Sequence, residues 1–462
     1  MRNYIICAIL LVFLPWLMPL QAQEPVGQLP LGHLTLDEAI AWSLNHSPVL
    51  TIGRLKLQQD DQELSRIQRS KIPDIYLSGD FRRNLVVPTT PIPAYFLNPN
   101  ADPGQLLYMK FNTGWNSGAG INFSVDIFNP ASYNRSLDQK IQNKINSYDL
   151  NISETGKRAE IAKAYAACVI SQDQLESVKS DTLFYHESLI EAKVLYDQHK
   201  ISLTDRNNIV IAYNTSIMQF WNAEKVLSEY RTNLLYLLGE EITNGKLDSL
   251  HLSENIPALY EKMIPSVTEY SAANQISGAE MTGSGLSRQS EVVALARNRV
   301  KSSRLKIAPS LSLNAFYGAN YYSNDFNPGN GDLWHGNSFV AMSLKVPLTQ
   351  AFSTSRETAR LKLQEQIETE NLQDMQNLKS KELNDGRNRL SISVQEYEML
   401  RQNYELGKEN LNAFRARLDR TYIQEKDYLE EQVRCRNSYQ RFLQAAYNVF
   451  INTIDLQKMK AE

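Results

Sequence analysis

Hydrophobic and polar residues alternate in four segments of the chain. Such an alternation, with a period of two, predicts a β-strand whose apolar side chains share one face and whose polar side chains share the other. Each predicted strand is long enough to cross a bilayer when it is tilted. The four segments are 74–87, 115–128, 309–322 and 337–348.

Between these strands, apolar residues recur at helical spacing over very long stretches. They predict two helical hairpins, 136–238 and 354–460, and the returning arm of each hairpin has the 4 and 3 spacing of a coiled coil. A shorter helix precedes each strand pair, and Thr35 and Glu38 are placed to form a capping box at the start of the first. These shorter helices are predicted over 35–70 and 287–306.

The same order of elements occurs twice along the chain. Asn116 and Ser117, at the start of one strand, recur as Asn337 and Ser338 about 221 residues later. This period is too long for a solenoid unit and indicates an internal duplication of a half-protein. The predicted organisation is a first repeat, a linker that could form an equatorial collar, and a second repeat. Their limits are 23–250, 251–286 and 287–462.

Residues 1–22 have the pattern of a secretory signal peptide. A basic start is followed by a short apolar run, which Pro15 and Pro19 interrupt and which ends near Ala22. The alternative is a membrane-anchor helix, for which the run is short. Cys7 lies inside the apolar run, so lipid attachment there is not expected. No later stretch approaches the roughly 20 apolar residues of a spanning helix, so any membrane insertion has to use strands.

Composition excludes several classes of function. The formal net charge is −3, and no cluster of Lys and Arg stands out, which argues against nucleic acid as a partner. Cys168 and Cys435 fall at distant heights on the predicted helices, too far apart for a disulfide. His186 and Glu187 begin like a zinc-protease motif, but no second histidine follows. We therefore predict no catalytic, metal or cofactor site, and no enzyme activity.

Four strands raise a problem of closure. They cannot close a barrel alone, and an unclosed sheet in lipid would leave backbone groups without hydrogen bonds. Two interpretations remain open on the pattern alone. The strands belong to an oligomer in a membrane, or they form a small soluble sheet in a structural coiled-coil protein of the periplasm or cell surface.

The ordered set of segments resembles the TolC-like outer-membrane efflux protein family, also called outer membrane factors. The resemblance implies a mixed α and β membrane protein. It would be a trimer with one 12-stranded transmembrane β-barrel, four strands per protomer, continued by a long periplasmic α-helical coiled-coil barrel. The similar segments are 34–40 and 45–48, the strand starts 73–77 and 309–313, the hairpin turns 201–205 and 423–427, and 237–239.

The same resemblance implies function and partners. The chain would be an outer-membrane exit duct with a periplasmic extension, in a tripartite efflux or type I secretion system. It would passively conduct small molecules or polypeptides. Its partners would be the other chains of a homotrimer, a periplasmic adaptor (membrane fusion) protein, an inner-membrane pump of RND or ABC type, and outer-membrane lipid.

Three groups of candidate residues follow. Lipid is expected to contact Ile121, Phe123, Val125, Ile127, Val340, Met342, Leu344 and Val346. By the resemblance, the adaptor would dock at the hairpin tips, Lys200, Ile201, Ser202, Asp205, Tyr422 and Ile423. By the resemblance too, Asp427 and Glu430 would form an acidic ring at the periplasmic aperture, where Arg420 and Lys426 would pair with them.

Both tip assignments have a limit. Asp427 and Glu430 would equally suit the ordinary role of acids at a helix start, where the helix dipole favours them. The family's usual glycine before each turn is replaced by Lys200 and Tyr422, so adaptor contacts do not transfer in detail.

Overall fold

A computed structural model describes residues 31–69, 71–102, 104–262, 282–418 and 425–462. The predicted signal peptide lies outside these ranges, as does most of the predicted linker. The chain divides into two compact units. One comprises Met1–Ser43 and Ser171–Asn255, and the other comprises Leu44–Ile170 and Ile256–Glu462.

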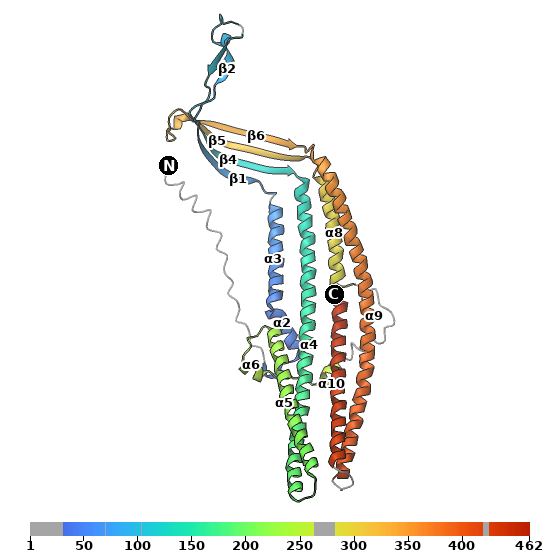
Figure 1. The fold of residues 1–462 in the computed structure, drawn as a ribbon. Coiled ribbons are helices and arrows are strands. Elements are labelled where there is room, and N and C mark those ends of the chain that lie inside the picture. The colour runs from blue at the N-terminus through green and yellow to red at the C-terminus, as the bar shows by residue number, and fades with distance from the viewer. Residues whose placement is uncertain (1–30, 70, 103, 263–281, 419–424) are drawn as a thin grey trace. The chain divides into compact units, whose positions relative to one another are not determined.

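The second unit contains a four-stranded antiparallel sheet with the strand order β1-β4-β5-β6 (Figure 1). Each strand corresponds to one predicted segment, with shifted ends. The first strand ends at Arg83, although Asn84 still donates its N–H to Gly114 O, at 2.8 Å, in the same register. The last stops before Pro347, which has no N–H for the ladder. The bounds are β1 Asp74–Arg83, β4 Trp115–Phe128, β5 Ser310–Ser323 and β6 Trp334–Lys345.

The connection between β1 and β4 is not a plain loop. It contains β2 (Thr90–Pro93) and β3 (Leu106–Met109), which pair with each other, and the short helix η3 (Ala94–Phe96). Prolines are tolerated here because each of the two strands has a free edge. The β5–β6 connection contains another short helix, η5 (Gly331–Leu333).

Two helices are exceptionally long, and the first of them begins in this unit and continues beyond Ile170 into the other. α4 (Pro130–Asp197) and α9 (Gln350–Leu418) have 68 and 69 residues, hence about 100 Å of axis each. α4 begins earlier than expected, at Pro130, because the fixed φ of proline suits the first helical position. The other helices of this unit are α3 (Pro48–Arg69), α8 (Ser284–Leu305) and α10 (Glu425–Ala461).

No helix in the described ranges combines the length and the apolar character that a membrane crossing requires.

Aromatic rings and small apolar residues hold α9 and α10 together. Tyr397 lies 5.4 Å from Phe442, measured between ring centroids, and Tyr260 stacks on Tyr397 at 4.2 Å. The Tyr260 hydroxyl donates to Glu398 Oε1 at 3.1 Å, and burial raises the pKa of Tyr260. Of the α10 side chains with the 4 and 3 spacing, Cys435, Ala445, Val449 and Leu456 are buried.

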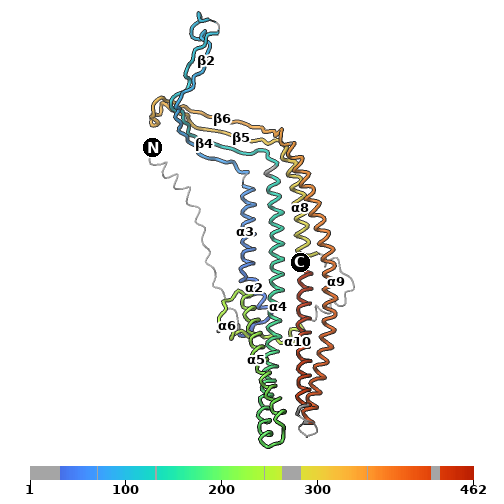
Figure 2. Tube along the Cα trace, viewed as in Figure 1, coloured from blue at the N-terminus to red at the C-terminus, as the bar shows by residue number. Residues whose placement is uncertain are grey.

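α10 ends where α8 begins, as Figure 2 shows. The N–H of Gly285, in the first turn of α8, donates to the backbone oxygen of Glu462. The negative end of one helix dipole thus faces the positive end of the other.

In the other unit, α5 (Leu203–Leu238) returns along the end of α4. Its predicted seam positions Ile209, Ser216, Ala223, Leu227 and Leu234 are buried. α6 (Asn244–Ser249) and η2 (Leu31–His33) complete this unit. A parallel bridge between Leu34 and Leu252 holds the start of the described chain to the segment after α6.

The helix predicted over 35–70 is two helices. α2 (Leu36–His46) ends before Ser47, and α3 begins with Pro48, because the residue before a proline is disfavoured in the helical region. The predicted capping box is confirmed. Thr35 N–H donates to Glu38 Oε2 at 3.0 Å, Glu38 N–H donates to Thr35 Oγ1 at 3.3 Å, and these bonds lower the pKa of Glu38.

Candidate membrane surface and hairpin tips

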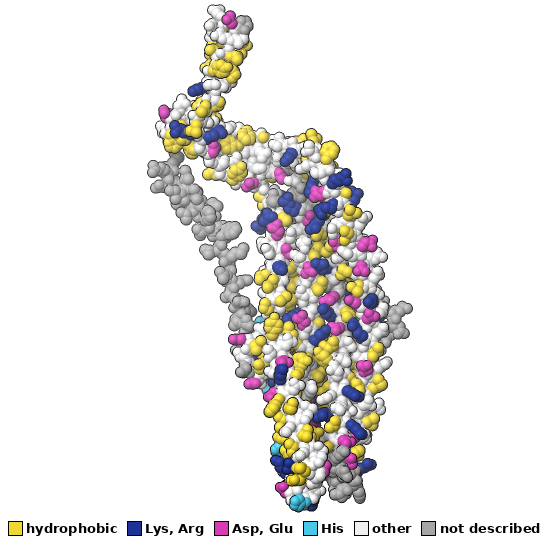
Figure 3. All heavy atoms as spheres, viewed as in Figure 1, with side chains coloured by type: hydrophobic (Ala, Val, Ile, Leu, Met, Phe, Trp, Pro, Cys, Tyr) yellow, Lys and Arg dark blue, Asp and Glu magenta, His cyan; other side chains and the backbone are white. Residues whose placement is uncertain are grey.

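One face of the four-stranded sheet is apolar across all of its strands. The register places Leu77 opposite Ile121, Ile121 opposite Tyr317, and Leu313 opposite Met342. Val340 is 74% exposed and Leu77 is 79% exposed. Hydrophobic side chains are visible over the strands in Figure 3. A continuous apolar surface of this kind marks contact with a membrane or another protein.

The structure places six of the eight predicted lipid-facing residues on this face, within the regular strands. Ile127 lies in a β-bulge, because the register shifts between Asp126 and Phe128 and Phe128 pairs with Leu311. Val346 is exposed but follows the last residue of β6. A bulge reverses the side of the next residue, so Phe128 takes the apolar position that the pattern gives to Ile127.

The opposite face is lined mainly by polar side chains that pair across strands. Asn122 Nδ2 donates to Ser78 Oγ at 2.7 Å, and Ser124 Oγ donates to Asn314 Oδ1 at 2.9 Å. A sheet that separates lipid from water needs this difference between an apolar face and a polar face.

A stacked pair of phenylalanine rings interrupts the polar face. Phe316 and Phe339 stack with their centroids 5.9 Å apart. The Phe316 ring lies over Gly120 and Gly318, which oppose each other in the register, and a Cβ added to Gly120 would lie 2.6 Å from it. Alternation alone does not reveal this contact. Glycines inside two strands are the signal, because they often mark a close approach.

A second aromatic cluster lies at the end of the sheet away from the helices. Tyr321 is fully buried, 5.4 Å from Trp334 and 6.4 Å from Phe81 between ring centroids. Its hydroxyl donates to Asp325 O at 2.8 Å, and Trp334 Nε1 donates to Pro328 O at 2.9 Å. The cluster therefore fixes the connection between β5 and β6 to the sheet.

The sheet has two edges without a neighbour among the described strands. β1 and β6 each pair along one side only. The strands are all antiparallel and even in number, so the two edges run in opposite directions. Unpaired edge groups are a template for pairing with another chain.

The first hairpin tip is closed by a reciprocal capping box. Ser202 Oγ accepts from Asp205 N–H at 3.1 Å and donates to Asp205 Oδ2 at 2.6 Å, and Ser202 N–H donates to the same oxygen at 3.2 Å. The left-handed residue of the turn is His199, with φ of 53°, rather than the neighbouring Lys200. Ile201 is half-buried and Lys200 is exposed. The tip is thus an ordered, polar surface.

We expect Ser202→Ala to loosen this tip by about 1 kcal/mol, because the cap satisfies N–H groups at the start of α5 that have no other partner. Hydrogen exchange of the amides in the first turn of α5 should become about fivefold faster. Thr204→Ala, two residues along, is the matched control and should leave the exchange unchanged. Equal protection in both variants would contradict a capping role for Ser202.

The second hairpin tip is described only from Glu425 onward. Asp427 and Glu430 are exposed and are three residues apart on α10, so they share a face. Arg420, Tyr422 and Ile423 lie outside the described residues, and Lys426 belongs to the first turn of α10. Glu431 faces the seam, where it is 7% exposed, and Arg434 Nη1 lies 3.5 Å from its Oε2. This seam is more polar than that of α5, which has Ile209 at the equivalent position.

Among the described residues, no group of three or more His, Cys, Asp or Glu side chains is placed to hold a metal ion. Cys168 and Cys435 are buried, and neither forms a disulfide. The candidate functional surfaces of the described residues are therefore the sheet faces, the sheet edges and the hairpin tips.

Comparison with known proteins gives one consistent result. No family model matches the chain. The outer membrane protein TolC of Vibrio cholerae is 23% identical over 346 residues, which cover 74% of this chain and 75% of that protein. The CmeC outer membrane channel of Campylobacter jejuni has a TM-score of 0.72, 15% identity, and coverage of 92% of this chain and 85% of that one. The open MtrE outer membrane channel of Neisseria gonorrhoeae has a TM-score of 0.66, 12% identity, and coverage of 95% and 94%.

The sheet with one apolar face, joined to long helical hairpins, is therefore the fold of the outer membrane channels. CmeC and MtrE are channels rather than enzymes. The resemblance that the sequence predicts is confirmed, and the chain is TolC-like.

Proposed function

We propose that this protein is an outer-membrane exit duct of a tripartite efflux or type I secretion system. The apolar face of the four-stranded sheet carries the proposal, because a surface so exposed and so continuous needs a lipid partner. The chain resides in the outer membrane and extends into the periplasm. It conducts small molecules or polypeptides passively.

Closure of the sheet supports a homotrimer. An open edge in lipid leaves N–H and C=O groups without partners, so a membrane sheet has to close. Because β1 and β6 run in opposite directions, β6 of one copy can pair antiparallel with β1 of the next. Three copies then form one 12-stranded barrel, four strands per protomer, with the polar face inside. The long helices continue it as a periplasmic barrel.

The hairpin tips are the proposed docking and gating region. A periplasmic adaptor would contact Lys200, Ile201, Ser202, Asp205, Tyr422 and Ile423, and an inner-membrane pump of RND or ABC type would deliver the cargo. Asp427 and Glu430 would repeat threefold at the aperture, where a ring of carboxylates favours cations. Arg420 and Lys426 would pair with them in the closed state.

We expect Asp427→Ala combined with Glu430→Ala to raise conductance in planar bilayers, because removing the ring also removes the ion pairs that close it. Divalent cations should lower the conductance of the parent protein and not that of the variant. Glu187→Ala combined with Glu191→Ala, which removes two exposed carboxylates from α4, is the matched control. Unchanged conductance and unchanged divalent sensitivity would remove these two residues from the gate.

The oligomeric state tests the duct itself. Extraction that requires detergent and yields a heat-resistant trimer with conductance in bilayers supports it. Recovery from the periplasm as a detergent-free monomer or dimer would instead favour a structural coiled-coil protein with a small soluble sheet.

A further inference from the structure

The second repeat carries a strongly basic segment next to the sheet. Residues 297–306, at the end of α8, include five Lys or Arg and no acidic residue. Figure 3 shows Lys and Arg side chains gathered on the helices where they meet the sheet. The first repeat differs at the equivalent positions before its strand. Asp61 and Glu63 stand there in α3, and Gln68 stands six residues before β1 as Arg304 stands six before β5.

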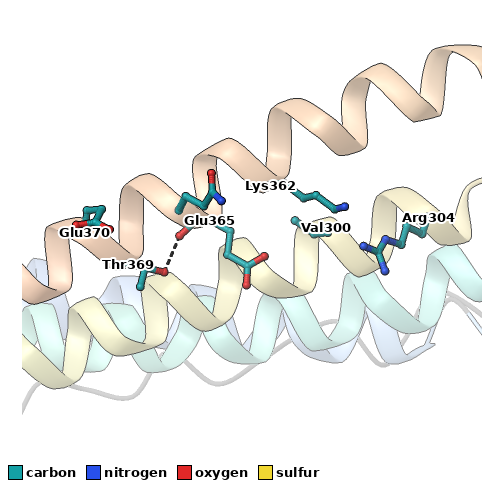
Figure 4. A pocket seen from close by; sticks show the side chains of 7 residues that line it. Val300, Arg304, Lys362, Glu365, Thr369 and Glu370 are labelled. Atoms are coloured by element: carbon teal, nitrogen blue, oxygen red, sulfur yellow. Dashed lines mark hydrogen bonds between the residues drawn. The ribbon is translucent and has the colours of Figure 1, made fainter.

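An open groove lies between the end of this segment and α9. It has a volume of about 410 Å³ and is lined by Arg304, Ile307, Thr354, Ser355, Thr358, Ala359 and Lys362. A second hollow of about 380 Å³ continues it along α9 and shares Arg304 and Lys362. Figure 4 shows these two cations close together at one end, with Glu370 at the other.

The two cations have no internal counter-ion. Both side chains are exposed, and no hydrogen bond or ion pair joins either of them to a described residue. The nearest acid of the lining, Glu365, is held by Arg297 Nε at 3.1 Å. Ser355 adds an exposed hydroxyl group to the same wall, while Thr354 is buried and Thr358 Oγ1 forms a hydrogen bond with Ser303 Oγ at 3.0 Å. Two cations without a counter-ion beside an exposed hydroxyl group suit a phosphate group.

The groove lies beside apolar surface. Lys362, Ala359 and Ser355 share one face of α9 with Phe352, at spacings of 3, 4 and 3. Phe352 is 82% exposed, and Leu348, which follows the end of β6, is 80% exposed. Arg304 lies on the order of 10 Å below the start of β5, within the reach of a head-group layer next to the hydrocarbon core.

We propose that this groove binds the phosphate head group of an anionic phospholipid, with the acyl chains lying along the apolar surface at Phe352 and Leu348. This inference rests on the proposed membrane location of the sheet. Lys362 has no counterpart in the first repeat, where Ile141 stands at its position, so each protomer has one such site. The lipid would fix the second hairpin to the membrane surface and leave the first free of this contact.

The test is lipid binding by the purified full-length protein. Native mass spectrometry measures its binding of dioleoylphosphatidylglycerol and of dioleoylphosphatidylcholine. Arg304→Gln combined with Lys362→Gln should weaken binding of the anionic lipid about 30-fold, since each basic residue at a membrane surface contributes about 1 kcal/mol. Arg299→Gln combined with Arg360→Gln removes the same charge from the same helices outside the groove. It should weaken binding less than threefold, and Arg304→Lys combined with Lys362→Arg should retain binding.

Three results would overturn the proposal. The double variants could lose affinity equally, the parent protein could bind both lipids alike, or soluble glycerol 3-phosphate could compete at the same concentration as the lipid. The last result would identify the ligand as a free anion. Conductance in bilayers of phosphatidylcholine separates this question from the duct. A protein that conducts there without preferring the anionic lipid contradicts only the groove, and one that never conducts contradicts the duct.

Discussion

Val340→Arg should abolish assembly in the outer membrane. Val340 is exposed at the middle of β6 on the apolar face, and an arginine on the lipid face of a barrel costs about 2–4 kcal/mol near the bilayer midplane. In a trimer this cost applies three times. We expect the variant to be lost from the heat-resistant trimer in outer-membrane fractions, as measured by gel electrophoresis without boiling.

Ala341→Arg is the control, because residue 341 pairs with Asn314 on the polar face. It should assemble normally and shift the selectivity of the pore toward anions. If Ala341→Arg prevents assembly and Val340→Arg does not, the faces of the sheet are assigned the wrong way round.

Gly318→Ala should destabilise the sheet from within. A methyl group at residue 318 would lie 2.6 Å from Gly120 Cα and 2.8 Å from the Phe316 ring, and it would meet the backbone oxygen of Ala119. The ring can move, but the backbone of β4 cannot without losing its pairing. Overpacking of this kind costs about 1–3 kcal/mol, so the proposed trimer should dissociate at a clearly lower temperature.

Two variants make that result interpretable. Gly336→Ala, in β6, would meet no atom within 4 Å and should leave the dissociation temperature unchanged. Gly318→Ala combined with Phe316→Ala should remain unstable, because the clash with the β4 backbone persists. Full rescue by Phe316→Ala would show that the ring, and not the backbone, sets the limit.

The strands of the main sheet could be predicted from the sequence because their two faces meet different surroundings. In the structure, the alternation around Phe123 and Met342 gives the sheet two chemically distinct faces. The bulge at Ile127 could not be predicted, since it depends on how β4 pairs with β5, which a single strand does not encode. β2 and β3 could not be predicted for a related reason, because a short proline-containing segment becomes a strand only when it pairs with its partner.

The helices could be predicted where apolar residues recur over a long stretch. Their ends and breaks were harder to predict, because single residues decide them. The capping box at Thr35 follows from two residue types at a fixed spacing, and the structure confirms it. The break at Ser47 comes from a single proline inside an otherwise helical pattern. The groove at Arg304 and Lys362 joins residues about 58 positions apart, and only the packing of α8 against α9 brings them together.

The two open edges of the sheet also determine the order of events in biogenesis. A single chain that entered lipid alone would bury unpaired backbone groups along β1 and β6, each costing several kcal/mol. In the proposed trimer, association of the three chains therefore has to precede or accompany insertion. The rate at which membrane-embedded protein appears should therefore rise more steeply than linearly with the concentration of newly exported chains. Its yield then depends on the rate of synthesis and on how long single chains remain unassociated before insertion.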